Sequence, residues 1–143
     1  MSRTILVGLD DSNNSQRAIE FARHCLDDNT VIALVYVIEW SRFSFSTVEE
    51  NAQRHKRREE ELQRAHEMIL KPAAEKLQAE NIPVECYARH GHVAEVMNKL
   101  AVKLDAEMIV IGKRGNSALA RKLFGTTTAS LVQVAEKPVV VVP

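Results

Sequence analysis

The glycines of this chain are concentrated in a short window whose residue types could bind a phosphate group. Three of the five glycines, Gly112, Gly115 and Gly125, lie there, and Thr126 follows the last of them. Glycine has no Cβ, so its backbone N–H can approach an anion closely. An apolar run, Met108 to Ile111, leads into the window, and a helix predicted to start at Thr126 would add unpaired N–H donors and a favourable dipole. This pattern predicts a phosphate cradle, and therefore nucleotide binding.

Two better-known nucleotide motifs are missing, and one plainer interpretation remains. The sequence contains no GxxxxGK[ST], which excludes a P-loop, and no GxGxxG follows its first strand, which weakens a nicotinamide or flavin interpretation. The alternative to a phosphate cradle is that the glycines only close a strand-to-helix turn.

The elements that must position the window alternate between strand and helix. Five strands separated by helices favour right-handed crossovers, hence an α/β fold with a parallel sheet and helices on both faces. Apolar runs suit strands buried on both sides. We expect one domain over residues 1–143. The predicted strands are Arg3 to Leu9, Thr30 to Ile38, Pro83 to Arg89, Glu107 to Ile111 and Pro138 to Val142. The predicted helices follow the turn Asp10 to Ser15 and cover Thr47 to Asn81, Val93 to Leu104 and Thr126 to Glu136.

The long segment from Thr47 to Asn81 is the most charged part of the chain. Its apolar residues recur in helical register, and Pro72 is expected to kink or divide the helix. The run Arg54 to Arg64 mixes both signs of charge, which is typical of a solvated helix face rather than a nucleic-acid patch.

Composition excludes several classes of partner. The 143 residues carry 19 basic and 19 acidic side chains, so no net field attracts nucleic acid or an anionic membrane. No apolar run is long enough to span a membrane and no signal-peptide pattern opens the chain, so we expect a cytoplasmic protein. Cys25 and Cys86 form no CxxC pair and are expected to be buried, reduced thiols.

Nothing in the sequence predicts a catalytic centre or a metal site. The five histidines lack the spacing of a metal site, and no GxSxG nucleophile motif occurs. His90-Gly91-His92 follows the third predicted strand, where a turn and helix start is expected and a catalytic or ligand role is the alternative. We therefore expect a nucleotide binder that hydrolyses its nucleotide slowly at most.

Taken over its whole length, the sequence resembles the ATP-binding branch of the universal stress protein family. The family's signature G-2x-G-9x-G-[ST] is matched by Gly112, Gly115, Gly125 and Thr126. Its opening strand with a D-x-S turn is matched by Ile5 to Ser12, and its ending x-P-V-x-V-V by Lys137 to Val142. The match is weakest between Ser41 and Asn81.

The resemblance implies a sheet in the order 3-2-1-4-5, with a crevice at the carboxyl ends of strands 1 and 4, where the strand order reverses. It also implies an ATP site there, with ADP or AMP as alternatives and Mg²⁺ accompanying the phosphates. The phosphates would lie on the glycine loop and the helix start, and Arg114 either reaches them or is only solvated. Asp10 would accept hydrogen bonds from the nucleoside or face the bound Mg²⁺, and the resemblance favours the nucleoside end. The implied site residues are Gly8, Asp10, Val37, Ile111, Gly112, Arg114, Gly115, Gly125, Thr126 and Thr127.

One position departs from the family pattern. Members often carry Pro where this chain has Gly8. The departure loosens the local backbone but removes no side chain that would contact the adenine.

The resemblance leaves two functions open and implies a dimer. In the first, ATP or ADP sets the conformation or the partner binding of a stress-response protein. In the second, which the family's non-binding branch implies, a nucleotide-independent module of the same fold binds a protein partner that the sequence does not name. A homodimer is implied through the apolar edge strand Val139 to Val142.

Overall fold

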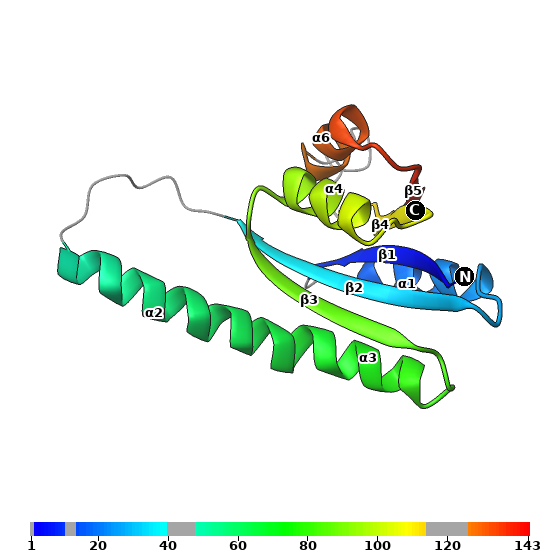
Figure 1. Ribbon diagram of the computed structural model, residues 1–143, viewed down its shortest axis with the longest axis horizontal. Helices are drawn as coiled ribbons and strands as arrows, with labels where there is room; N and C mark the ends of the chain where they lie inside the picture. The colour runs from blue at the N-terminus through cyan, green and yellow to red at the C-terminus, as the bar shows by residue number, and fades with distance from the viewer. Residues whose placement is uncertain (1, 11–13, 40–47, 114–125) are drawn as a thin grey trace.

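The structure contains one five-stranded parallel sheet. It is a computed structural model that describes residues 2–10, 14–39, 48–113 and 126–143. The strand order is β3-β2-β1-β4-β5, and every neighbouring pair is parallel (Figure 1). This confirms the predicted fold class and strand order. The strands are β1 (Arg3–Leu9), β2 (Thr30–Glu39), β3 (Val84–Gly91), β4 (Met108–Gly112) and β5 (Val139–Val142).

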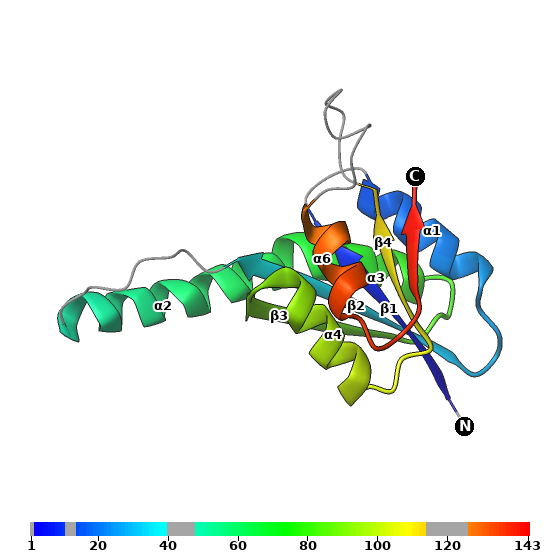
Figure 2. The same ribbon diagram turned by 90° about the horizontal axis from the view of Figure 1, so that it is seen from above.

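Helices cover both faces of the sheet because successive strand residues point to opposite sides. In β1, Ile5 and Val7 pack in the cluster with α1 (Asn14–His24) and α3 (Lys71–Gln78), whereas Leu6 packs in the cluster with the helices of the other face. That second layer consists of α4 (Val93–Lys103) and α6 (Thr126–Val134), which lie side by side (Figure 2). All three of these β1 side chains are fully buried.

A π-helical turn joins two α-helices in the segment between β2 and β3. α2 (Val48–Ala65) continues into the π-helix η1 (His66–Leu70) and then into α3, whose first turn contains Pro72. Proline lacks the N–H that an α-helix would use at this position. The sequence predicted a kink or a division at Pro72; the structure instead has a change of helix type just before Pro72, and the helical turns continue through it. The amino-terminal half of α2 extends beyond the sheet in both views (Figures 1 and 2).

β2 and β3 are longer than predicted. β2 reaches Glu39, and its last two residues pair with His90 and Gly91. The expectation that His90 and Gly91 form a turn after the strand was therefore wrong, because β2 supplies them with a partner. Gly91 has a φ of +147°, and a Cβ built on it would lie 2.7 Å from Cγ2 of Val96. Glycine at this position lets the chain pass directly from β3 into α4.

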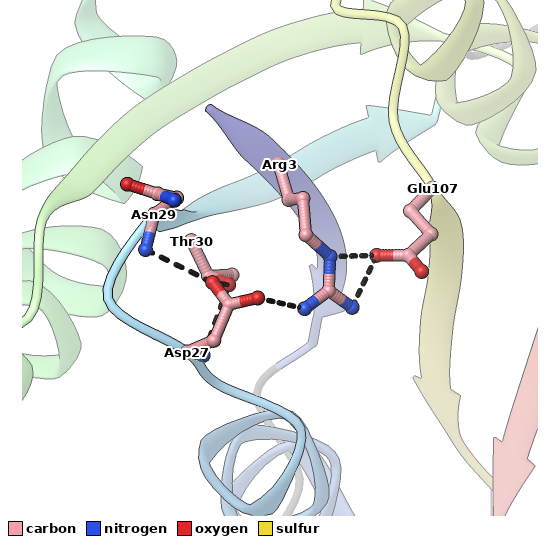
Figure 3. Close-up of polar contacts among 5 residues, drawn as sticks. All are labelled: Arg3, Asp27, Asn29, Thr30 and Glu107. Atoms are coloured by element: carbon pink, nitrogen blue, oxygen red, sulfur yellow. Dashed lines mark hydrogen bonds and ion pairs between the residues drawn. The ribbon is translucent and has the colours of Figure 1, made fainter. Parts of the chain in front are cut away.

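The amino edge of the sheet is held by a polar cluster around Arg3 (Figure 3). Nε of Arg3 donates to Oε2 of Glu107 (2.7 Å), and its Nη1 donates to Oδ2 of Asp27 (2.5 Å). The other oxygen of Asp27 accepts hydrogen bonds from Thr30 Oγ1 (2.7 Å) and the backbone N–H of Asn29 (2.9 Å). The cluster thus links the start of β1 to the loop before β2 and to the start of β4.

Both cysteines are half-buried free thiols rather than fully buried ones. Burial raises the pKa of the Cys86 thiol, whose Sγ lies 3.9 Å from the carbonyl oxygen of Leu70. Among the described residues, no helix combines the length and apolar character needed to cross a membrane.

Candidate functional site

A pocket lies at the carboxyl ends of β1 and β4, where the strand order reverses. β1 pairs with β2 on one side and with β4 on the other, and Gly8 lies opposite Ile111 across the β1–β4 pair. Connections leave two such strands in opposite directions, which opens a crevice between their carboxyl ends. The pocket is lined by Gly8, Leu9, Asp10, Ser15, Tyr36, Val37, Val93, Met97, Ile111, Gly112, Thr127 and Thr128.

Six of the ten predicted site residues line this one pocket. They come from β1 and the residue after it, from β2, from β4 and from α6, and are Gly8, Asp10, Val37, Ile111, Gly112 and Thr127. Segments far apart in the sequence are thus brought together, as the predicted topology requires. Val37 lies two residues before the end of β2 at Glu39.

The other four predicted residues are not all described. Arg114, Gly115 and Gly125 lie outside the described residues, so their places in the site stay predictions. Thr126 is the first residue of α6, which agrees with the predicted start of that helix.

The floor of the pocket is formed by a close contact between β1 and α4. A Cβ built on Gly8 would lie 2.5 Å from Cε of Met97 and 3.2 Å from Cγ2 of Ile111. Gly8 is therefore the residue that allows Met97 to lie against the β1 backbone. Met97 is only 4% exposed, so its thioether and Ile111 give the pocket an apolar base.

A hydrogen-bond network holds Asp10 in the wall of the pocket. The backbone N–H of Asp10 donates to Oγ of Ser15 (2.7 Å). The Ser15 hydroxyl lies within donating distance of Oδ1 (2.9 Å) and the carbonyl oxygen (3.0 Å) of Asp10. Ser15 is buried in the first turn of α1, which connects this network to a helix packed on the sheet.

The first turn of α6 supplies hydroxyl groups to the pocket. Thr127 is half-buried and Thr128 is buried, and both residues line the cavity. The first N–H groups of a helix have no intrahelical partner and carry the positive end of its dipole. The pocket therefore combines an apolar base, a carboxylate and a helix start suited to an anion.

Sequence reasoning missed six residues of the pocket lining: Leu9, Ser15, Tyr36, Val93, Met97 and Thr128. Val93 and Met97 lie in the predicted helix Val93 to Leu104, and Met97 belongs both to the core of that face of the sheet and to the pocket lining. Thr128 belongs to the Thr126–Thr128 run that marked the helix start, and Ser15 belongs to the turn after β1. Only the hydroxyl residues of the helix start and of the turn after β1 could have indicated that Thr128 and Ser15 line the pocket.

The two histidines around Gly91 do not line the pocket. Nε2 of His90 lies 3.1 Å from the carbonyl oxygen of Arg58, which connects β3 to α2, and His92 is the residue before α4. Within the described ranges, no group of three or more His, Cys, Asp or Glu side chains is arranged to hold a metal ion.

Comparison with known proteins identifies relatives over the full length of the chain. The sequence model of the universal stress protein family matches residues 1–143. Universal stress protein G of Salmonella typhimurium is 30% identical over 99% of both chains.

Solved structures of the same family share the fold. Universal stress protein UspA from Lactobacillus plantarum superposes with a TM-score of 0.77 at 20% identity, covering 99% of this chain and 97% of its own. A universal stress protein in complex with cAMP gives a TM-score of 0.66 at 22% identity, covering 99% and 96%. One from Archaeoglobus fulgidus in complex with dAMP gives 0.61 at 18% identity, covering 99% and 98%.

Proposed function

Since this chain belongs to the universal stress protein family, we propose that it acts as one domain that binds an adenine nucleotide, first of all ATP, in the pocket between β1 and β4. The observation that carries the proposal is the convergence of six residues predicted for a nucleotide site on one cavity. Two structural neighbours were solved with adenine nucleotides, cAMP and dAMP, which supports the choice of base.

The lining of the pocket suits the two ends of a nucleotide differently. Adenine would lie on the apolar base, against Val37, Ile111 and the backbone of Gly8. Asp10 would accept hydrogen bonds from the nucleoside, because a carboxylate would repel phosphates.

The phosphates would lie at the other end of the pocket, accompanied by Mg²⁺. Gly112 and the first turn of α6 line the cavity there, and we assign Arg114, Gly115 and Gly125 to the same phosphate end. The hydroxyls of Thr126 and Thr127 would donate to phosphate oxygens.

The bound nucleotide would act by changing the stability or the partner binding of the protein. We propose nucleotide binding and no catalytic step. A ligand present at a hundredfold excess over its dissociation constant stabilises the folded state by about 2.7 kcal/mol. A nucleotide-independent interaction module is the second candidate, favoured by the exposed half of α2 that extends beyond the sheet (Figure 1).

Calorimetric titration of nucleotide-stripped protein with Mg-ATP tests the proposal. We expect one site per chain, no binding by Gly125→Val, whose side chain would occupy the phosphate path, and weaker binding by Thr127→Val, which loses a donor. Thr4→Val, the same change near the amino edge of β1, is the matched control and should bind normally. Absence of heat at several temperatures would favour the interaction module.

We also propose that two copies of the chain associate through β5. This strand pairs with β4 on one side, and among the described residues no strand pairs with its other side. An apolar edge strand with an open side is a ready template for pairing with a second chain.

A further inference from the structure

We propose that Ser15 is a positioning residue for nucleoside recognition, because it holds the Asp10 carboxylate in the orientation that accepts hydrogen bonds from the nucleoside. The inference rests on the proposed nucleotide site. It assigns a role to a side chain that the sequence motifs did not single out.

One oxygen atom of Ser15 contacts both the main chain and the side chain of Asp10. Oγ accepts the Asp10 backbone N–H at 2.7 Å and lies 2.9 Å from Oδ1 of the same residue. A hydroxyl has a single proton, which it donates to Oδ1 or to the Asp10 carbonyl oxygen at 3.0 Å. The rotation of the Asp10 side chain is therefore coupled to its own backbone through Ser15.

This arrangement differs from ordinary capping of a helix. A capping hydroxyl accepts an N–H from two or three residues further along the chain. Ser15 instead bonds to a residue five positions earlier, and that residue lines the pocket. The serine has only 7% of its surface exposed, so water is a poor substitute for these hydrogen bonds.

The support under Ser15 is rigid. The next turns of α1 place Ala18, Ile19 and Ala22 in the core against β1, each 6% exposed or less. The position of the Ser15 backbone is fixed by this packing. Replacing the hydroxyl should therefore weaken the hold on Asp10 while α1 stays in place.

The test compares Ser15→Ala, Asp10→Ala and the double variant in titrations with Mg-ATP, adenosine and inorganic tripolyphosphate. We expect Ser15→Ala to weaken ATP and adenosine binding about tenfold, the typical effect of losing a hydrogen bond to a charged group. Tripolyphosphate binding should change less than about twofold, because Asp10 faces the nucleoside. In the Asp10→Ala background, Ser15→Ala should have little further effect.

Three further measurements separate positioning from a general structural role. Amide hydrogen exchange at Asp10 should speed up in Ser15→Ala, because its N–H loses the Ser15 acceptor. Ser15→Cys, similar in size but a weaker hydrogen-bond partner, should reproduce the loss of affinity if Ser15→Ala folds poorly. Ser130→Ala, on a half-buried serine of α6 that does not line the pocket, should bind normally.

The outcomes distinguish this inference from the proposed function. If the unmodified protein binds neither ATP nor adenosine, the proposed function fails and the role of Ser15 fails with it. If the protein binds both and Ser15→Ala binds them equally well, only the role of Ser15 is overturned. An equal loss for tripolyphosphate, or an undiminished loss in the Asp10→Ala background, would also overturn it.

Discussion

At the scale of single residues, the cluster around Arg3 makes stability depend on pH. The hydrogen bond from Thr30, followed by that from Arg3, lowers the pKa of Asp27 from 3.8 to about 2. A carboxyl group whose pKa is lower in the folded state stabilises the fold above its unfolded pKa. This contribution is lost as the pH falls through the folded value, so the window lies between about pH 4 and pH 2.

We predict that Asp27→Asn is less stable than the unmodified protein above pH 4 and that this difference shrinks towards pH 2. Urea unfolding at several pH values measures it. Thr30→Val removes the hydrogen bond that lowers the pKa most, so it should raise the lower end of the window and leave the upper end near pH 4. A difference that stays constant between pH 4 and pH 2 would contradict the assignment.

The pocket residues show what a sequence can reveal about a site. Gly112 was predicted as the first glycine of the spaced signature, and Thr127 as a hydroxyl residue at the helix start that follows it. Met97 could not be predicted as part of the pocket, because a methionine on the core-facing stripe of a helix is equally consistent with packing. Its contact with Gly8 depends on how α4 lies against β1, and that distance is a property of tertiary packing.

At the scale of elements, the two halves of the α2–η1–α3 segment should differ in their importance for folding. Between Ala52 and Glu60, every side chain except that of Arg54 is exposed, whereas Ala73, Ala74 and Leu77 are in the core. An exposed helix end can open locally without unfolding the rest of the protein.

We predict that Ala74→Gly destabilises the protein by about 1–2 kcal/mol, from lost helix propensity and lost packing. The same change at Ala52 should alter the free energy of unfolding by less than about 0.5 kcal/mol, because that half opens first. Urea unfolding measures the free energy of unfolding of both variants. An equal loss at the two positions would show that α2 and α3 unfold as one unit.

The strands were predicted closely because their apolar runs must be buried on both faces. β1 has the predicted limits, and the other strands differ by one or two residues at their ends. The extension of β3 through Gly91 depends on the length of its neighbour β2, which the local sequence does not encode. The π-helical turn before Pro72 likewise could not be predicted. Helical periodicity shows which face of a helix is buried, but it does not distinguish an α-helix from a π-helix.

At the scale of the whole molecule, the proposed dimer can be tested by one substitution in β5. The carbonyl oxygen of Pro138 accepts a hydrogen bond from Ile109 of β4, and that of Val142 accepts one from Lys113, the residue after β4. The pleat then directs the backbone groups of Val139 and Val141 towards the open edge.

We predict that Val141→Pro is monomeric, because proline removes an N–H from the open edge while leaving the bonds to β4 intact. Val141→Thr keeps that N–H with a side chain of nearly the same shape and should remain dimeric. Analytical ultracentrifugation measures both variants. If Val141→Pro stays dimeric, the association does not use the edge of β5.

The central place of β1 also determines how the protein should respond to mechanical force. β1 runs parallel to both of its neighbours, and β5 runs parallel to β4. The start of β1 therefore lies at the amino ends of the strands, and the end of β5 lies at their carboxyl ends (Figure 2). A pull between the start of β1 and the end of β5 therefore shears the strands along their length. In this geometry many inter-strand hydrogen bonds bear the load together and must break together. The same sheet that opens a pocket at its carboxyl edge should resist stretching along its strands.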